Sequence, residues 1–193
     1  AVDNYYASST FSEGNLDCAN SSSTETFNAS TIGVSSGKWY CEVKVITLSS
    51  RVHIGVANKL SDATGNYIGQ NSNSYAYAHY DGHKWNNGDG GSFGNTYTTN
   101  DIIGIALDLD NNKLYFSKNG TWQNSGGSTS GATGRGSMYN LTASSSTSAG
   151  AYFFAGGKRS PEAIKLSWNF GSPSFSISSG NTDGNGYGNF EYA

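Results

Sequence analysis

Ser92 has the sequence spacing of a hydrolase nucleophile. Residues 90–94, Gly-Gly-Ser-Phe-Gly, match the pattern G-x-S-x-G, in which a sharp turn from a strand into a helix lifts the serine hydroxyl above a sheet. No helical pattern follows Ser92, and a chain with 26 glycines produces such a match by chance. The sequence therefore predicts no catalytic residue at this position.

His79, Asp81 and His83 carry metal-binding atoms at every second position. On an extended strand the three side chains would share one face and could hold a metal ion. However, Asp81-Gly82 is a turn signal that breaks this face, and the spacing identifies no further ligand. We therefore expect no metal and no cofactor.

The acidic residues have neither the number nor the spacing of a calcium loop or a glycosidase site. A run beginning at Asp108 resembles a calcium loop, but Lys113 stands where that loop needs glycine and Asn119 where it needs glutamate. A glycosidase needs two carboxylates across a cleft, and Glu42 falls on the outward phase of its strand, where we expect it to be solvated. A different calcium site near Asp183 stays open beside the simpler interpretation of a string of turns. We predict that the chain is not an enzyme.

The stretch 101–122 predicts a β-hairpin followed by a second tight turn. Apolar residues alternate with polar or small ones over 102–109, which is typical of a strand with one face in a core, and the alternation restarts at 114–116. Between these runs, residues 110–112 are Asp-Asn-Asn, which tolerate the left-handed backbone of a short turn, and Asn119-Gly120 is a second turn signal.

The same pattern recurs along the chain and predicts an all-β fold of two antiparallel sheets packed face to face. Strands are expected at about 38–48, 51–57, 75–80, 102–109, 113–118, 151–155 and 163–170. Residues assigned to the core include Phe27, Ile32, Trp39, Cys41, Phe116, Trp168 and Phe170.

Composition limits the function classes. A chain of 193 residues fits one domain, and 13% charged residues with a net charge of −3 provide no basic stripe for nucleic acid. No apolar run approaches the roughly 20 residues of a membrane span, and the N-terminus lacks a signal-peptide pattern. We expect neither nucleic-acid binding nor membrane insertion. The two cysteines, Cys18 and Cys41, could form one disulfide or remain free core residues.

Several short motifs occur in an order that resembles the SPRY domain family. These motifs are Gly37-Lys38-Trp39-Tyr40-Cys41-Glu42-Val43, Ile54-Gly55-Val56, the tyrosine-rich stretch 75–82, the hairpin 101–110, Phe116-Ser117-Lys118-Asn119-Gly120 and Asn169-Phe170-Gly171. The resemblance covers most of the chain. It implies a single SPRY-type sandwich over 1–193, with entry strands at 1–36, a core at 37–171 and a Gly/Asn-rich tail at 172–193.

The segment 181–192 also resembles the ends of SPRY segments carried by bacteriophage structural proteins. This resemblance implies a non-catalytic virion component, such as a tail fibre, a head decoration or a neck appendage, located on the virion surface and therefore extracellular. Its partners would be other virion proteins or further copies of itself. Two alternatives stay open: an adhesin that recognises a host glycan or protein through its loops, and a peptide-binding SPRY adaptor.

Three long connections, at 58–74, 83–100 and 123–150, are expected to carry the partner-binding residues, because loops on a rigid sandwich commonly bind. Aromatic side chains there offer flat contact area at a small entropic cost. The candidate binding residues are Tyr67, Trp85, Tyr97, Trp122, Arg135, Tyr139 and Tyr152.

Overall fold

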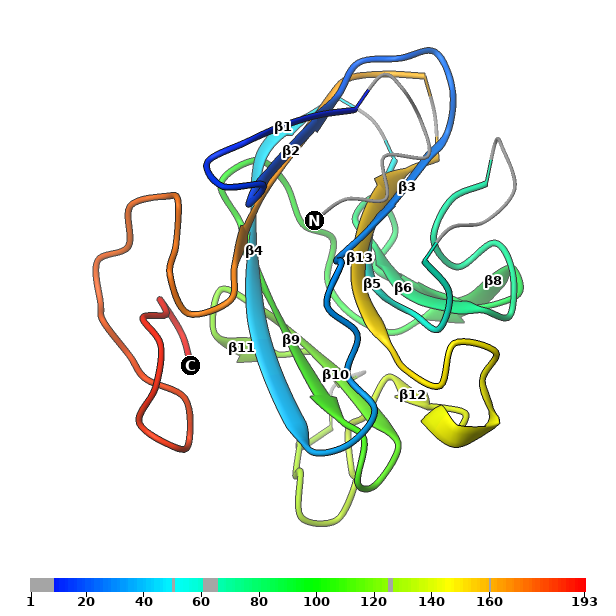
Figure 1. Ribbon diagram of the computed structural model, residues 1–193, viewed down its shortest axis with the longest axis vertical. Coiled ribbons are helices and arrows are strands. Elements are labelled where there is room, and N and C mark those ends of the chain that lie inside the picture. The colour runs from blue at the N-terminus through cyan, green and yellow to red at the C-terminus, as the bar shows by residue number, and fades with distance from the viewer. Residues whose placement is uncertain (1–8, 50, 61–65, 125–126, 160) are drawn as a thin grey trace.

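Two antiparallel β-sheets pack face to face, which confirms the predicted all-β sandwich (Figure 1). The computed structural model describes residues 9–49, 51–60, 66–124, 127–159 and 161–193. In this part of the chain, no helix has the length and apolar character needed to cross a membrane.

The first sheet, called sheet A, has the strand order β1-β2-β14-β4-β9-β10-β11, and β12 pairs with β10. The second sheet, called sheet B, has the order β3-β13-β5-β6-β7-β8. The elements are β1 Ser9–Ser12, β2 Asp17–Asn20, β3 Thr26–Ala29, β4 Lys38–Leu48, β5 Val52–Ala57, β6 Ser74–Ala78, β7 His83–Trp85, β8 Asp89–Ser92, β9 Ile102–Asp108, β10 Lys113–Lys118, β11 Thr121–Trp122, β12 Tyr139–Asn140, the 3₁₀ turn Ser144–Ser146, β13 Phe153–Lys158 and β14 Ile164–Asn169.

The core lies between the sheets and is built from the inward positions of both. Ile105, Phe116 and Trp168 come from sheet A, and Ile54 and Tyr77 come from sheet B. The alternation in the sequence therefore placed most inward residues correctly, because successive side chains of a strand point to opposite faces.

Three residues expected in the core are exposed instead. Ile32 is 75% exposed, Trp39 47% and Phe170 46%. Ile32 lies in the connection before β4, Trp39 is the second residue of β4, and Phe170 follows the last residue of β14. The inward phase of a strand secures burial only where another element covers the side chain, and these three lie outside or at the ends of strands.

Glu42 departs from expectation in the opposite direction. It lies on the outer face of sheet A, where the sequence predicts a solvated carboxylate, yet it is 0% exposed. The C-terminal segment covers it, since the main-chain N–H groups of Glu191 and Tyr192 donate to its carboxylate.

Cys18 and Cys41 are both buried free thiols, so the possible disulfide is not formed. Cys18 lies on β2 and Cys41 on β4, and β14 runs between these two strands. The intervening strand holds the two sulfur atoms apart. Burial is the main reason why the pKa of the Cys18 thiol rises to about 12, which makes it a poor nucleophile.

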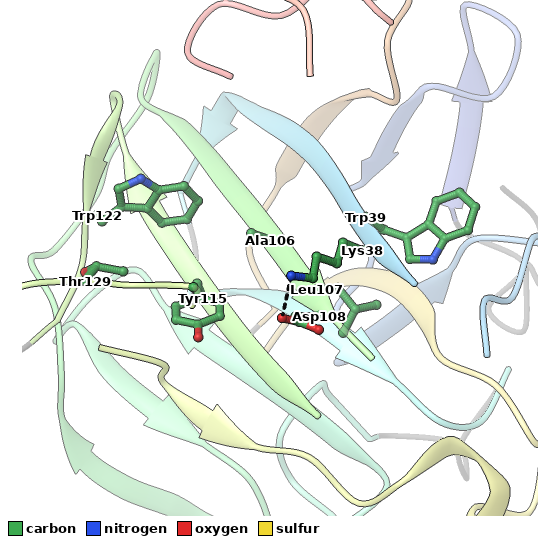
Figure 2. A pocket seen from close by; sticks show the side chains of 9 residues that line it. Lys38, Trp39, Ala106, Leu107, Asp108, Tyr115, Trp122 and Thr129 are labelled. Carbon is green, nitrogen blue, oxygen red and sulfur yellow. Dashed lines mark ion pairs between the residues drawn. The ribbon is translucent and has the colours of Figure 1, made fainter. Parts of the chain in front are cut away.

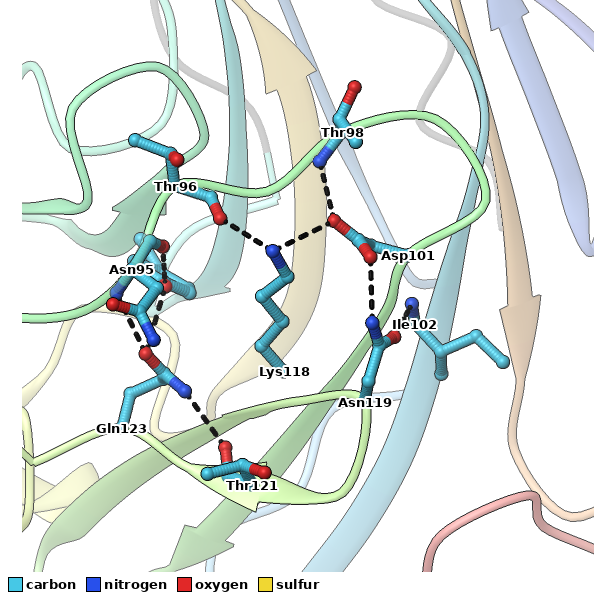
Figure 3. A network of polar contacts seen from close by, with 10 residues as sticks. Asn95, Thr96, Thr98, Asp101, Ile102, Lys118, Asn119, Thr121 and Gln123 are labelled. Carbon is cyan, nitrogen blue, oxygen red and sulfur yellow. Dashed lines mark hydrogen bonds and ion pairs between the residues drawn. The ribbon is translucent and has the colours of Figure 1, made fainter.

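Lys118 and Asn119, from the motif Phe116-Ser117-Lys118-Asn119-Gly120, belong to a polar network that fixes the β9–β10 hairpin to its neighbours (Figure 3). Asn119 accepts a hydrogen bond from the Ile102 amide at 2.8 Å and donates one to Asp101 at 2.7 Å. Lys118 contacts Asp101 at 3.1 Å and donates to the carbonyl of Thr96 at 2.8 Å. The K-N-G signature therefore has a structural role here.

Asn119→Ala is expected to lower the free energy of unfolding by about 2–3 kcal/mol, because it removes two hydrogen bonds, one of them to a carboxylate. Asn119 also has a φ of 46°, a left-handed conformation that disfavours alanine. Urea denaturation would measure the loss. Asn119→Gly is the matched control. Glycine adopts the left-handed backbone without strain but still lacks the two side-chain hydrogen bonds, so this variant should be less destabilised than the alanine variant. Wild-type stability in both variants would contradict this role.

Candidate functional site

The outer face of sheet B is built from small residues, which leave room for aromatic side chains above them. Gly55, Ala76 and Ala155 are paired neighbours on β5, β6 and β13. Tyr67 and Trp85 pack on this layer and are 7% and 6% exposed. The sheet thus carries a second, thinner apolar layer on the side away from the main core.

Arg159 lies over the edge of this second apolar layer. Its guanidinium carbon lies 4.5 Å from the centre of the Trp85 ring and 5.1 Å from that of Tyr67. One of its nitrogens donates a hydrogen bond to the Tyr80 hydroxyl at 3.0 Å. Stacking on aromatic faces holds the planar guanidinium in a fixed orientation, and the bond to Tyr80 uses one of its five N–H donors.

Arg51 lies beside Arg159 because the two residues flank the paired ends of neighbouring strands. Val52 begins β5, Lys158 ends β13, and these two residues are partners in the sheet. The guanidinium carbon of Arg51 lies 5.0 Å from the centre of the Tyr80 ring. We call the five residues that meet here the arginine–aromatic cluster. They are Arg51, Tyr67, Tyr80, Trp85 and Arg159.

The chemistry of this cluster suits a protein segment. Guanidinium groups bind carboxylates and carbonyl oxygens with paired, directional hydrogen bonds. The aromatic rings beside them supply apolar contact area, and arginine, tryptophan and tyrosine are the residue types that dominate protein–protein binding energy.

His53 lies beneath the cluster and is fully buried. Its ring centre is 5.2 Å from that of Tyr67 and 5.3 Å from that of Trp85. Its Nδ1 lies 2.8 Å from the carbonyl oxygen of Ile68. Burial, assisted by the nearby charge of Arg159, lowers the pKa of His53 to about 3. His53 is therefore a neutral support for the rings at physiological pH.

This depressed pKa predicts a loss of stability in mild acid. The unfolded chain binds a proton at His53 below about pH 6.5, whereas the folded protein does not until the pH approaches 3. The free energy of unfolding should therefore fall as the pH drops through this window, by about 2 kcal/mol near pH 5 from His53 alone. Urea denaturation at about pH 7 and about pH 5 would measure the change.

The control for this pH effect is His53→Gln, which removes the titrating ring but keeps a polar side chain. The variant should lose roughly 2 kcal/mol less than the wild type between the two pH values. Equal losses in both proteins would show that His53 does not cause the acid sensitivity.

The predicted binding residues fall into different parts of the structure. Tyr67 and Trp85 belong to the arginine–aromatic cluster. Tyr97 and Tyr152 are 2% and 0% exposed and fill the main core. Their hydroxyls donate to main-chain carbonyls inside the protein. The expectation that these two present their rings to a partner is corrected, because their connections turn the side chains inward.

Of the remaining three predicted residues, Trp122 and Arg135 lie outside the cluster, and Tyr139 lies next to it, because its hydroxyl is hydrogen-bonded to the main chain of Trp85. Trp122 is 39% exposed and borders an open pocket of about 270 Å³, beside the Lys38–Asp108 ion pair of 3.6 Å (Figure 2). Tyr139 is half-buried, and its hydroxyl donates to the main chain of β6. Arg135 is exposed in the connection before β12. The seven residues therefore do not form a single site, and a binding role for these three stays a prediction.

Of the three residues considered for a metal ion, His79 lies apart from the other two. His79 accepts a hydrogen bond from the Val52 amide at 3.0 Å, so it points toward β5. Asp81 and His83 instead group with Asp89, and Nδ1 of His83 lies 2.9 Å from a carboxylate oxygen of Asp89. In the described residues these contacts form a hydrogen-bonded turn at the β7–β8 hairpin.

Sequence reasoning missed Arg51, Tyr80 and Arg159. The arginines are 108 positions apart in the numbering and meet only through the β5–β13 pairing. Part of a signal was present, since Arg51 begins the predicted strand 51–57, but Arg159 lies four residues after the predicted strand 151–155, and only the strand order reveals that the two are neighbours.

Comparison with known proteins now defines the family. Residues 38–157 match the SPRY domain family, and the chain belongs to it. The crystal structure of the SPRY domain of human HERC1 superimposes with a TM-score of 0.66 and covers 83% of this chain and 91% of that one, at 16% sequence identity. That likeness shows the fold. SPRY domains generally serve as non-catalytic protein-interaction modules.

Curated relatives of this chain include several animal proteins. Ran-binding protein 9 of zebrafish is 35% identical over 86 residues, which is 44% of this chain and 14% of that protein. Human Ran-binding protein 9 is 34% identical over the same length, and the matched residues make up 12% of that protein. The chain thus matches only a small part of these relatives.

These relatives overturn one expectation. The chain was expected on a virion surface, outside the cell, from the resemblance of its tail to phage proteins. The relatives found are Ran-binding proteins of animals, so that location is wrong. The short tail motif misled because it is rich in Gly and Asn, which many unrelated turns share.

Proposed function

We propose that the arginine–aromatic cluster of this interaction module binds an extended segment of a partner protein. The observation that carries the proposal is Arg159, whose guanidinium is stacked on two rings at 4.5 and 5.1 Å and is only half-buried. A fixed, partly exposed guanidinium with further N–H donors beside the one bonded to Tyr80 offers directional hydrogen bonds to carbonyl or carboxylate groups at little entropic cost.

A protein partner fits this surface better than the other classes considered. Nucleic acid would need a basic surface, and the net charge is −3. A glycan site would need several exposed rings around one concavity, whereas Tyr97 and Tyr152 lie in the core. A role inside a virion gains no support from the animal relatives.

The partner could be found by selecting peptides from a random display library on the wild-type chain and measuring each affinity by calorimetry. Ran should be tested separately, because the relatives carry its name. We expect selected peptides to bind the wild type and to lose affinity for variants of the cluster. Peptides that bind such variants as tightly as the wild type would contradict the proposal.

A further inference from the structure

The C-terminal segment is held on the outer face of sheet A by a buried carboxylate. Glu42 accepts hydrogen bonds from the main-chain N–H of Glu191 at 2.9 Å and of Tyr192 at 2.7 Å. The hydroxyl of Tyr40 and the amide of Asn169 complete its shell, both at 3.2 Å. All four of these donors are neutral groups. The hydrogen bonds of the buried carboxylate therefore come from a peptide backbone and two polar side chains, without a positive charge.

Phe190 fills an apolar slot next to this carboxylate. It is 3% exposed, and its ring meets that of Tyr40 edge to face at 5.1 Å. Gly104 makes the slot possible, because a Cβ atom there would lie 2.7 Å from the Tyr40 hydroxyl. The absence of a side chain on β9 lets Tyr40 lie across the sheet and form one wall of the slot.

Asn169 adds a third contact to the segment. Its side-chain amide donates to the carbonyl of Asn189 at 2.9 Å. The sheet thus contacts the carbonyl of one residue, the ring of the next and the N–H groups of the following two. A carbonyl contact, an aromatic anchor and paired amide contacts are the elements by which proteins bind extended peptides.

The bound segment is organised on its own and is tethered to the sandwich by an exposed stretch. Asn181 and Phe190 form a main-chain bridge, and Glu191 accepts from the Ser178 amide at 2.6 Å. Every residue of 178–189 is exposed or half-buried. In Figure 1 this segment, coloured orange to red, lies beside β4 on the side away from sheet B. It also lies outside the family match at 38–157.

We propose that the surface formed by Tyr40, Glu42 and Asn169 is a second peptide-docking site, occupied in cis by residues 189–192. Its outside partner would be an extended protein segment with an aromatic residue followed by two free backbone amides. The tether keeps the resident segment at a high effective concentration, of the order of millimolar. The site is therefore closed to weak ligands and opens to a segment that binds better than the resident one.

This site is independent of the function proposed above. The arginine–aromatic cluster lies on the outer face of sheet B, and the docked segment lies on the outer face of sheet A. Loss of binding at one site should leave the other unchanged, so failure of either proposal can be recognised separately.

The test uses the full chain, with the Phe190 ring removed from the apolar slot. Phe190→Ala removes the resident anchor, and a fluorescein-labelled peptide of Ile177–Ala193 is titrated while anisotropy is recorded. We expect the variant to bind this peptide at least about tenfold more tightly than the wild type does, because the cis competitor is weakened. A control peptide in which the phenylalanine is also replaced by alanine should not bind.

Glu42→Gln tests the carboxylate in the Phe190→Ala background. The substitution keeps the shape of the side chain but replaces one acceptor oxygen with a donor group. Peptide affinity should fall at least about tenfold, since charge-assisted hydrogen bonds are lost. Unchanged affinity, or a Phe190→Ala variant that binds no better than the wild type, would overturn the proposal.

A second measurement needs no substitution and covers the case in which the Glu42 variant fails to fold. Hydrogen exchange of the wild type should show the Glu191 and Tyr192 amides opening more often than the amides of β4, through local release of the segment. Exchange of these two amides only together with β4, on global unfolding, would show that the segment is a fixed part of the fold and would overturn the proposal.

Discussion

Replacing Gly55 with alanine is expected to lower the free energy of unfolding by about 4 kcal/mol or more. Gly55 lies at the centre of β5, where a Cβ atom would lie 1.9 Å from the carbonyl oxygen of Tyr75 and 3.0 Å from the Cα of Ala76. Both atoms belong to the backbone of β6, so no side-chain rotation can relieve the overlap. The strands must separate, and the main core and the outer apolar layer would both loosen.

Thermal and urea denaturation of purified Gly55→Ala would measure this loss. Gly184→Ala is the matched control, since a Cβ placed there meets no atom within 4 Å apart from its own residue and its chain neighbours. It should leave the unfolding midpoint nearly unchanged. A Gly55→Ala variant as stable as this control would show that β5 and β6 can separate without cost, against the packing described above.

Arg159→Ala should reduce affinity for partner peptides by about 30- to 1,000-fold, which corresponds to roughly 2–4 kcal/mol for a residue at the centre of an interface. The loss combines the missing hydrogen bonds with the uncovering of the Trp85 and Tyr67 rings. Arg159→Lys keeps the charge but not the planar stack, so it should recover only a small part of the affinity. Calorimetry with library-selected peptides would measure the affinities of the wild type and of the two Arg159 variants.

Lys165→Ala is the matched control for this prediction, because it removes a positive charge on β14 of sheet A, outside the cluster. It should bind the peptides as the wild type does. An equal loss in the Lys165 and Arg159 variants would indicate a general effect of charge. Wild-type affinity in the Arg159 variant would place the binding surface elsewhere.

Much of the fold follows from local patterns in the sequence. The expected strands at 38–48 and 113–118 agree with β4 and β10, because period-two alternation and left-handed turn residues are local signals. The burial of a side chain was harder to predict where it depends on contact with residues far away in the sequence. Trp39 and Phe170 have the inward phase but lie at strand ends, and Glu42 has the outward phase but is covered by a segment about 150 residues away in the chain, as the Tyr192 contact illustrates.

The candidate site was only half predictable for the same reason. Tyr67 and Trp85 stand out as aromatic residues in segments that the sequence predicts to be long connections, although Trp85 ends the short strand β7. No local sequence pattern distinguishes Arg51, Tyr80 and Arg159. They come together only because β5 pairs with β13 and with β6. Aromatic type alone could not separate Trp85, which packs beneath a guanidinium, from Tyr97, which fills the core.

The most direct test of the central claim is hydrogen–deuterium exchange of the wild-type chain, with and without its tightest library-selected peptide. The account predicts slower exchange on binding at the start of β5, at the turn between β6 and β7 and at the end of β13, where the arginine–aromatic cluster lies. Protection confined to the Trp122 pocket or the C-terminal segment, with none at these three positions, would contradict it.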